Sequence, residues 1–298
     1  MSVFPGEPNA VNIQYVVITP VRDEEAHLRS TIASMVSQTI RPREWVIVND
    51  GSTDGTAGII DESAAAHPWI RAVHRENRGF RKSGGGVVEA FNEGLDALVC
   101  NEWDFIVKLD GDLAFEPDYF EKCFAKFAAE PGLGIGGGII CYVENGTKRI
   151  EDGPTFHVRG ATKIYRKACW EAIGGFWPAP GWDTIDEVKA NKLGWTTRSF
   201  PELHLVHYRL TGAADGRWGG LVKNGRADYV CGYHPLYMMA KCAQRFLRVQ
   251  TIVDGVALMY GFVSGYLKRI PQVNDPGLIA YLRREQLHRL MGRQTIFR

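Results

Sequence analysis

The sequence offers little support for disulfide bonds, for secretion or for a common phosphate-binding glycine motif. The six cysteines are scattered and none forms a CxxC pair, a pattern typical of reduced core thiols in a cytosolic protein. Residues 1–8 contain no basic region followed by an apolar core, so we expect no signal peptide. The glycine-rich segment 81–86 does not fit Walker or Rossmann spacing, which argues against ATP hydrolysis and dinucleotide binding.

A large excess of charge of one sign is also missing, but the balance conceals an asymmetry. The 298 residues hold 35 Lys and Arg against 34 Asp and Glu, a formal net charge of +1. From residue 240 onward there are ten Lys and Arg against three Asp and Glu, so the rest of the chain is acidic. A basic tail on an acidic body indicates an anionic partner for the tail, a membrane surface or a nucleic acid.

Strand and helix patterns alternate through the first half of the chain. Short apolar runs predict buried strands, and apolar residues at helical spacing predict the helices between them. The expected strands are 15–19, 44–48, 70–74 and 103–109, and the expected helices are 24–38, 56–66 and 87–99. This order predicts an α/β fold with a mostly parallel sheet and helices on both faces.

Polar clusters follow three of these strands, at residues 19–24, 49–54 and 110–112. Because ligands of such sheets bind at the carboxyl ends of the strands, we expect the three clusters to converge. In the last cluster, Asp110 and Asp112 offer two carboxylates to a hard divalent cation, and the glycine between them lets a ligand approach the backbone. The alternative for an Asp-x-Asp is a role in a turn or cap.

The clusters belong to a longer series of motifs. The series is Thr19-Pro20-Val21-Arg22-Asp23-Glu24-Glu25, Val48-Asn49-Asp50-Gly51-Ser52-Thr53-Asp54-Gly55-Thr56, Asn77-Arg78-Gly79, Asp110-Gly111-Asp112, Gly174-Gly175-Phe176 and Asp183-Thr184-Ile185-Asp186-Glu187. In order and spacing, over residues 12–210, the chain resembles the family 2 glycosyltransferases, which are inverting and use nucleotide sugars. The resemblance implies a GT-A fold, a Rossmann-like, mostly parallel mixed sheet with helices on both faces. We expect a catalytic domain at 1–210, and a glycine-rich loop with a basic, helical C-terminal extension at 211–298.

The resemblance also implies a donor site. Asp50 would accept an N–H of a uracil-like base, with capping of the next turn as the alternative. Pro20 and Arg22 would shape the first loop against the base. Glu24 would contact the base or ribose, or favour the helix N-terminus electrostatically. Arg78 would pair with a base carbonyl or a phosphate, the alternative being a solvated loop residue.

Further donor contacts and a metal site are implied at the other clusters. Gly85 lies in a run of three glycines whose N–H groups would bind the diphosphate or the sugar, with a hinge as the alternative. Asp110 would face the ribose beside Gly111, and Asp112 would hold Mn²⁺ or Mg²⁺ to neutralise the departing diphosphate. His207 is the expected additional metal ligand, against a structural role in its strand.

Inversion requires a carboxylate that takes the proton of the acceptor hydroxyl. Counting back from the Gly-Trp pair at 194–195, the family's catalytic aspartate falls on Asp183, although the glutamate that usually precedes it is absent. Asp186 is the rival base, and Glu187 follows it one helical turn from Asp183. The alternative for Asp183 is a helix N-cap. Trp182 is expected to be an exposed indole that stacks on a sugar.

The C-terminal region has a different character. Residues 211–220 are rich in glycine and are expected to form a lid over the donor. Residues 249–267 are mostly apolar but short for a membrane span, and they contain Asp254. Since Lys268-Arg269 and Arg283-Arg284 flank this region, we expect a helix pair on the inner leaflet, with a homodimer or packing element as the alternative. A nucleic-acid partner is not expected, because the arginines interleave with aliphatic residues.

Together these patterns predict a metal-dependent inverting glycosyltransferase on the cytoplasmic face of a membrane. It would move a sugar from a nucleotide-diphosphate sugar, UDP-linked, to a hydroxyl of a glycan or lipid-linked acceptor in surface polysaccharide synthesis. One alternative is a polyprenyl-phosphate sugar transferase, whose phosphate acceptor needs little help from a base. The other is a nucleotide-binding module without catalysis.

Overall fold

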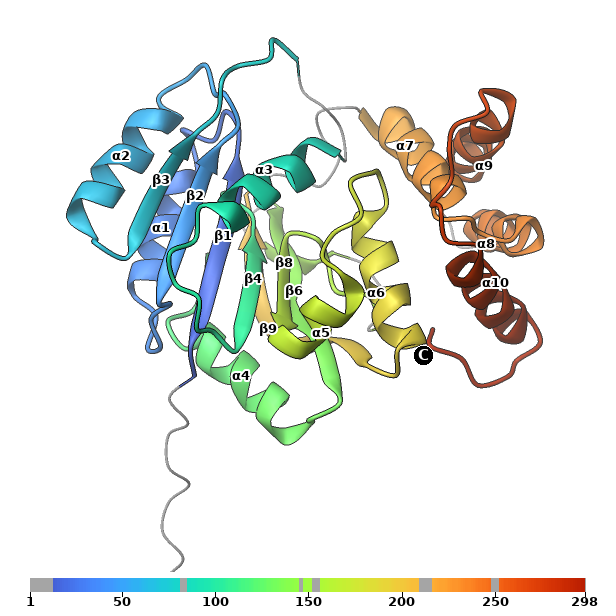
Figure 1. The fold of residues 1–298 in the computed structure, drawn as a ribbon. Helices are drawn as coiled ribbons and strands as arrows, with labels where there is room; N and C mark the ends of the chain where they lie inside the picture. The colour runs from blue at the N-terminus through green and yellow to red at the C-terminus, as the bar shows by residue number, and fades with distance from the viewer. Residues whose placement is uncertain are drawn as a thin grey trace, which may run out of the picture.

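The computed structural model of the chain describes residues 13–80, 85–144, 147–151, 156–208, 216–247 and 252–297. In its first third, strands and helices alternate as the sequence predicted (Figure 1). These elements are β1 (Tyr15–Val21), α1 (Leu28–Val36), β2 (Glu44–Asn49), α2 (Thr56–Ala66), β3 (Ile70–His74), α3 (Gly85–Asp96) and β4 (Phe105–Leu109).

Residues 113–207 add shorter and longer strands around three helices. In chain order they are β5 (Leu113–Phe115), α4 (Tyr119–Ala129), β6 (Leu133–Glu144), β7 (Thr147–Ile150), β8 (Thr162–Arg166), α5 (Lys167–Ile173), α6 (Trp182–Lys192) and β9 (Thr196–His207). Four helices follow: α7 (Gly216–Val230), α8 (Pro235–Leu247), α9 (Ile252–Leu267) and α10 (Pro276–Leu290).

The strands that the structure describes form one mixed sheet in the order β3-β2-β1-β4-β8-β6-β9-β5, with β7 paired to β6. The first four strands are parallel, so the ends of β1, β2 and β4 meet at one edge of the sheet. β8 then runs antiparallel to β4, and β5 runs antiparallel to β9. The expected α/β fold with a mostly parallel mixed sheet is therefore confirmed.

Burial on both faces explains the continuous apolar runs of the central strands. In β1, Tyr15 and Val17 pack into the core beneath α1, α2 and α4, whereas Val16 and Ile18 pack into the core beneath α3, α5 and α6. Each of these four side chains is fully buried. Such double burial is the rule for parallel strands with helices on both sides, and it fixes the edge where the polar clusters lie.

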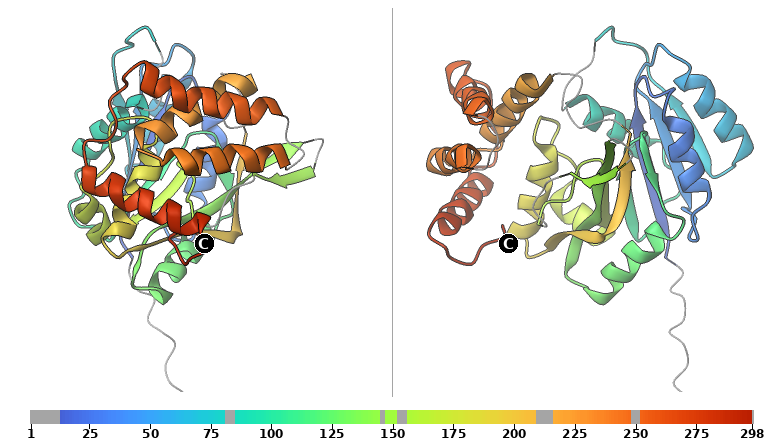
Figure 2. Two further views of the ribbon diagram at one scale, coloured as in Figure 1. Left: turned by 90° about the vertical axis from the view of Figure 1, so that its right-hand side faces the viewer. Right: turned by 180° about the vertical axis from the view of Figure 1, so that it is seen from behind.

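The C-terminal helices pack against α6 through a third core. Ile185 and Val188 of α6 share this core with apolar side chains of α7, α8, α9 and α10. Figure 2 shows these four helices grouped beside α6, on the side of α6 away from the sheet. The expected domain boundary at 210 lies outside the described residues, as does most of the expected lid. Residues 216–220 of that expected loop instead form the first turns of α7.

Within the described part of the chain, no helix combines the length and the apolar character that a membrane crossing requires. The polar residue inside the apolar segment, Asp254, is 3% exposed and accepts hydrogen bonds from Arg217 Nε at 2.9 Å and Nη2 at 2.6 Å. An internal aspartate is thus accommodated by an ion pair between α7 and α9.

Candidate active site

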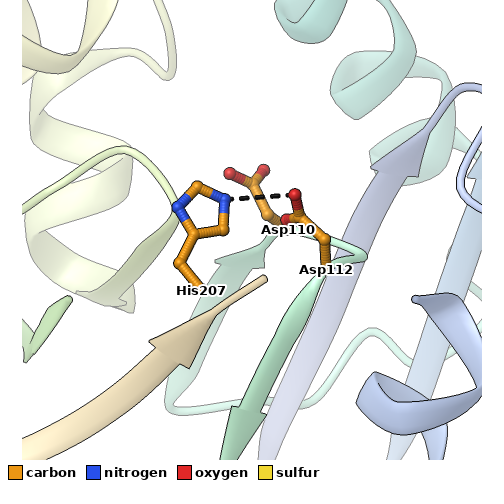
Figure 3. A group of neighbouring side chains, drawn as sticks. All are labelled: Asp110, Asp112 and His207. Atoms are coloured by element: carbon orange, nitrogen blue, oxygen red, sulfur yellow. Dashed lines mark hydrogen bonds and ion pairs between the residues drawn. The ribbon is translucent and has the colours of Figure 1, made fainter. Parts of the chain in front are cut away.

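Three side chains that can bind a metal meet at the carboxyl edge of the sheet. Asp110 follows β4, Asp112 precedes β5, and His207 ends β9, where its strand partner is Leu113. One ligand atom from each of the three lies within 4.8 Å of the others. Figure 3 shows the imidazole and the two carboxylates facing a common point, with His207 Nε2 3.1 Å from Asp112 Oδ2. Residues separated by almost a hundred positions are therefore joined by the short β5–β9 pairing.

The electrostatics of this cluster favour a positively charged occupant. Burial raises the pKa of Asp110, and the charge of Asp112 raises it further, whereas the ammonium group of Lys108 acts in the opposite direction. Burial alone would lower the pKa of His207, but its hydrogen bond to Asp112 and the charge of that carboxylate raise it overall. Lys108 also forms an ion pair with Asp110. The two carboxylates thus repel each other at a point where a cation would relieve the repulsion.

The donor set fits a divalent metal. Carboxylate oxygens suit Mg²⁺ and Mn²⁺, and an imidazole nitrogen is an acceptable further ligand for Mn²⁺. Asp112 is 6% exposed, so its carboxylate is fixed by its surroundings. The neighbouring Gly111 is required by packing, because a Cβ there would lie 2.4 Å from Val21 Cγ1. Asp110, Asp112 and His207 are consequently the residues that would hold a metal.

Two arginines enclose the predicted base-binding aspartate. Asp50 follows β2 and is 8% exposed. Arg75 Nη1 lies 2.5 Å from Asp50 Oδ1, and Arg78 pairs with the other carboxylate oxygen. Arg22 donates to the backbone oxygen of Asp50 at 2.9 Å and to Asn77 Oδ1 at 3.0 Å. The loops after β1, β2 and β3 are therefore tied together around Asp50, as the convergence of strand ends predicted.

Gly51 makes this close approach of the loops feasible. Its φ is +69°, a conformation that glycine adopts readily and other residues rarely do. A Cβ at Gly51 would lie 2.5 Å from Asn77 Cα. The glycine of the Asn-Asp-Gly-Ser motif is thus required by both its backbone conformation and the packing of the neighbouring loop.

The other predicted donor residues lie at the same edge or at the start of a helix. Pro20 is near the end of β1, where it pairs with Val48 of β2. Glu24 is 8% exposed, and its backbone N–H donates to Thr56 Oγ1 at 2.8 Å, which joins the β1–α1 loop to α2. Gly85 is buried and begins α3, whereas the preceding residues 81–84 lie outside the described part.

The two candidate bases have different environments at the start of α6. Asp183 is half-buried in the first turn. Asp186 is 1% exposed and accepts hydrogen bonds from Lys163 Nζ at 2.9 and 3.0 Å and from the Tyr165 hydroxyl. Burial raises the pKa of Asp186 to about 6, although Lys163 opposes the shift. The carboxylate of Asp186 is therefore engaged inside the protein.

Trp182 differs from the expectation of an exposed, sugar-stacking indole. It is 7% exposed, and its ring packs 4.5 Å from that of Phe176, centroid to centroid. Lys108 Nζ and Lys163 Nζ each lie 5.7 Å from the Trp182 ring centroid. Trp182 is thus the first residue of α6 and is buried where this helix packs on the sheet, which the local sequence does not reveal.

Sequence reasoning missed three residues that shape the site: Arg75, Lys108 and Lys163. Arg75 directly follows β3, so its position at a strand end was a usable signal. Lys108 is 2% exposed inside the apolar strand β4, and Lys163 is fully buried inside β8. A lysine within a buried strand needs an acidic partner, and this requirement alone would have marked both residues.

Comparison with known proteins identifies the family. Residues 16–178 match the family described as Glycosyl transferase family 2. Putative glycosyltransferase EpsH of Bacillus subtilis is 27% identical over 218 residues, covering 65% of this chain and 60% of that protein. Polyprenol monophosphomannose synthase of Mycolicibacterium smegmatis is 28% identical over 135 residues, covering 45% of this chain and 47% of the synthase. The chain thus matches less than two thirds of the length of either relative.

The fold has solved counterparts. The mannosyltransferase PcManGT from Pyrobaculum calidifontis, determined in complex with GDP-Man and Mn²⁺, is similar with a TM-score of 0.56 and 16% identity. The similarity covers 90% of this chain and 78% of PcManGT. At this identity the likeness concerns the fold. Because the family match covers more than half of this chain, the chain belongs to glycosyl transferase family 2, and it has the GT-A fold.

Proposed function

We propose that this protein is a metal-dependent inverting glycosyltransferase. It moves a sugar from a nucleotide-diphosphate sugar, UDP-linked, to a hydroxyl of a glycan or lipid-linked acceptor in surface polysaccharide synthesis. The observation that carries the proposal is the group Asp110, Asp112 and His207, whose ligand atoms lie within 4.8 Å of one another at the carboxyl edge of the sheet. Asp50 and its arginines lie at the same edge, two strands away.

This arrangement separates donor binding from charge neutralisation. The loops around Asp50 form the nucleoside side of the site, with Arg22 and Arg78 oriented toward it. Asp110 would face the ribose, and Asp112 and His207 would hold the cation. A bound divalent metal would neutralise the negative charge that builds up on the diphosphate as it leaves.

Asp183 is our candidate for the base, because the carboxylate of Asp186 is buried and already bonded to Lys163 and Tyr165. The acceptor oxygen forms a bond to the anomeric carbon while its proton passes to the Asp183 carboxylate. The bond from that carbon to the diphosphate breaks, and its electron pair leaves with the nucleoside diphosphate. Attack from the opposite side inverts the configuration.

A lipid-linked acceptor would place the enzyme on the cytoplasmic face of a membrane. The C-terminal region supports this location, because residues 216–297 hold twelve Lys and Arg against four Asp and Glu. Such a surplus favours an anionic lipid surface. A homodimer through the same helices is the competing arrangement.

A polyprenyl-phosphate acceptor is the second candidate function. It is favoured by the similarity to the mycobacterial polyprenol monophosphomannose synthase, which covers 45% of this chain. A phosphate acceptor is already ionised and needs no strong base. Substitution of Asp183 therefore distinguishes the two: hydroxyl transfer requires this carboxylate, and phosphate transfer does not.

The proposal is tested by a thermal-shift panel of UDP- and GDP-linked sugars, each with and without Mn²⁺. A ligand that binds only the folded protein raises its melting temperature. We expect a metal-dependent shift with one UDP-sugar, lost in Asp112→Asn and retained in Asp183→Asn. Asp118→Asn, at an exposed surface ion pair, is the matched control.

Transfer is then measured with the donor that the panel identifies. Turnover lost in Asp183→Asn with donor binding intact supports the assigned base. Full turnover in this variant would show that the base is misassigned or that the acceptor is a phosphate. A shift from a GDP-sugar alone would overturn the uridine assignment, and a shift from none of the nucleotide sugars would overturn the donor class.

A further inference from the structure

The outward face of α9 is apolar along its whole described length. Among the described side chains of this helix, those that are exposed are all aliphatic or aromatic: Val253, Val256, Tyr260, Val263, Tyr266 and Leu267. Their exposed fractions run from 42% to 78%. A solvent-facing helix normally carries charged or polar residues on this side. This face is therefore suited to an apolar environment.

Five of these residues form a narrow stripe, which we call the α9 outer face. Val253, Val256, Tyr260, Val263 and Leu267 fall within an arc of about 80° on a helix of 3.6 residues per turn, and they extend over about 21 Å. Trp218 of α7, 47% exposed, adds an indole beside Tyr260, with a centroid distance of 6.4 Å. The stripe thus continues onto the neighbouring helix with an aromatic residue.

The opposite side of α9 packs closely against α7. A Cβ at Gly261 would lie 2.1 Å from the Val222 backbone oxygen of α7, and one at Gly225 would lie 1.9 Å from the Leu258 oxygen. The two helices therefore touch backbone to backbone through glycines. In Figure 1 and in the right-hand view of Figure 2, α9 lies on the far side of α7 from the sheet, so the side of α9 opposite α7 points away from the sheet.

The charges around the α9 outer face are predominantly positive. Lys268 and Arg269 follow the helix directly and are exposed. The acidic residues of the four C-terminal helices and their connections each have a cation within 4 Å. These pairs are Asp228–Lys241, Asp254–Arg217, Asp275–Lys192 and Glu285–Arg284. The region therefore presents uncompensated positive charge beside an apolar stripe.

We infer that the α9 outer face inserts into the headgroup region of an anionic membrane. Exposed apolar surface marks a contact site, and the surrounding cations complement acidic lipid headgroups. Trp218 and Tyr260 have the amphipathic rings that occur at membrane interfaces. A second copy of the chain fits less well. A two-fold contact would gather the cations of both copies around one interface.

Flotation of the full-length protein with lipid vesicles tests this assignment. One set of vesicles contains phosphatidylcholine alone, and the other also contains phosphatidylglycerol. We expect the protein to float with the anionic vesicles. The double variant Val256→Asn/Val263→Asn should lower the bound fraction by at least about tenfold. The reason is that burial of two valine side chains changes the membrane partition coefficient by more than about tenfold. The matched control, Val99→Asn/Leu193→Asn, alters apolar residues of similar exposure on the catalytic region and should float like the parent.

A second pair of variants tests the charge. Lys268→Gln and Arg269→Gln should each weaken binding to anionic vesicles about fivefold, with no change on phosphatidylcholine. All variants should keep the parent melting temperature without lipid, because the altered side chains are exposed. The inference is overturned if the parent does not float, or if Val256→Asn/Val263→Asn floats like the parent. A lipid-free dimer that this double variant dissociates would also overturn it, because the face would then be a dimer interface.

Discussion

Lys108 and Lys163 stand directly opposite each other in the antiparallel pairing of β4 with β8. Lys108 pairs with Asp110 at the metal-binding cluster, whereas Lys163 pairs with Asp186 and donates to the Asp183 backbone oxygen at 2.5 Å. Two adjacent buried cations thus hold the two sides of the candidate active site. The β4–β8 pairing therefore positions both the start of α6 and the loop that contains Asp110.

Replacing Lys163 should destabilise the protein strongly. Lys163→Met leaves the fully buried Asp186 carboxylate without its cation, and breaking a buried pair in this way costs about 3–5 kcal/mol. Chemical denaturation measures the loss. The control is Lys122→Met, which removes an exposed pair between residues four apart and should change stability by about 0.5 kcal/mol or less. Equal effects of the two substitutions would contradict the structural role of Lys163.

The raised pKa of Asp186 predicts a pH-dependent stability. With a folded-state pKa of about 6 and an unfolded value near 3.9, this residue binds more protons in the folded state between roughly pH 4 and 6. Its contribution to the free energy of unfolding therefore falls as pH rises through that window, by up to about 3 kcal/mol. Above pH 6 the contribution no longer changes.

Urea denaturation at several pH values between 4 and 7 checks this prediction. Asp186→Asn removes the titrating group, so the free energy of unfolding should vary less between pH 4 and 6 than in the parent. Glu102→Gln, which alters an exposed carboxylate, should keep the parent profile. An unchanged profile in Asp186→Asn would mean that Asp186 titrates at its ordinary pKa.

Removing one metal ligand should weaken cation binding without unfolding the chain. Asp112→Asn and His207→Gln each take one ligand from the cluster within 4.8 Å, and we expect Mn²⁺ affinity to fall about 10–100-fold by calorimetry. His204→Gln is the control, because His204 hydrogen-bonds to the Pro201 backbone oxygen on the same strand. Undiminished Mn²⁺ affinity in both ligand variants would rule out this cluster as the metal site.

Two glycine substitutions should have opposite effects. Gly51→Ala forces a side chain onto a residue with φ of +69° and into contact with Asn77, so we expect a loss of at least about 1 kcal/mol and weaker nucleotide binding. Gly58→Ala lies in helix α2, where a Cβ meets nothing within 4 Å, and should stabilise the protein by up to about 1 kcal/mol. Thermal denaturation and nucleotide titration compare them. Similar results for both variants would exclude strain at Gly51.

The order of strands and helices could be predicted because each pattern is local. Helix 56–66 and strand 70–74 have the predicted bounds, and strand β1 extends the expected 15–19 by two residues. Continuous apolar runs specify strands covered on both faces, and parallel strands place their carboxyl ends at one edge. The convergence of the loops around Asp50 follows from this topology and was found.

The sequence alone determined the family, the α/β fold and the edge of the sheet at which the candidate site lies, because motifs and periodicity are carried by neighbouring residues. The tertiary structure decided what distant residues do to one another. The β5–β9 pairing brings His207 to Asp112, and packing of α6 against the sheet buries Trp182 at its first position. Lys163 neutralises Asp186 across the gap between a strand and a helix. Burial and charge pairing depend on contacts between segments far apart in the chain, and no local pattern contains them.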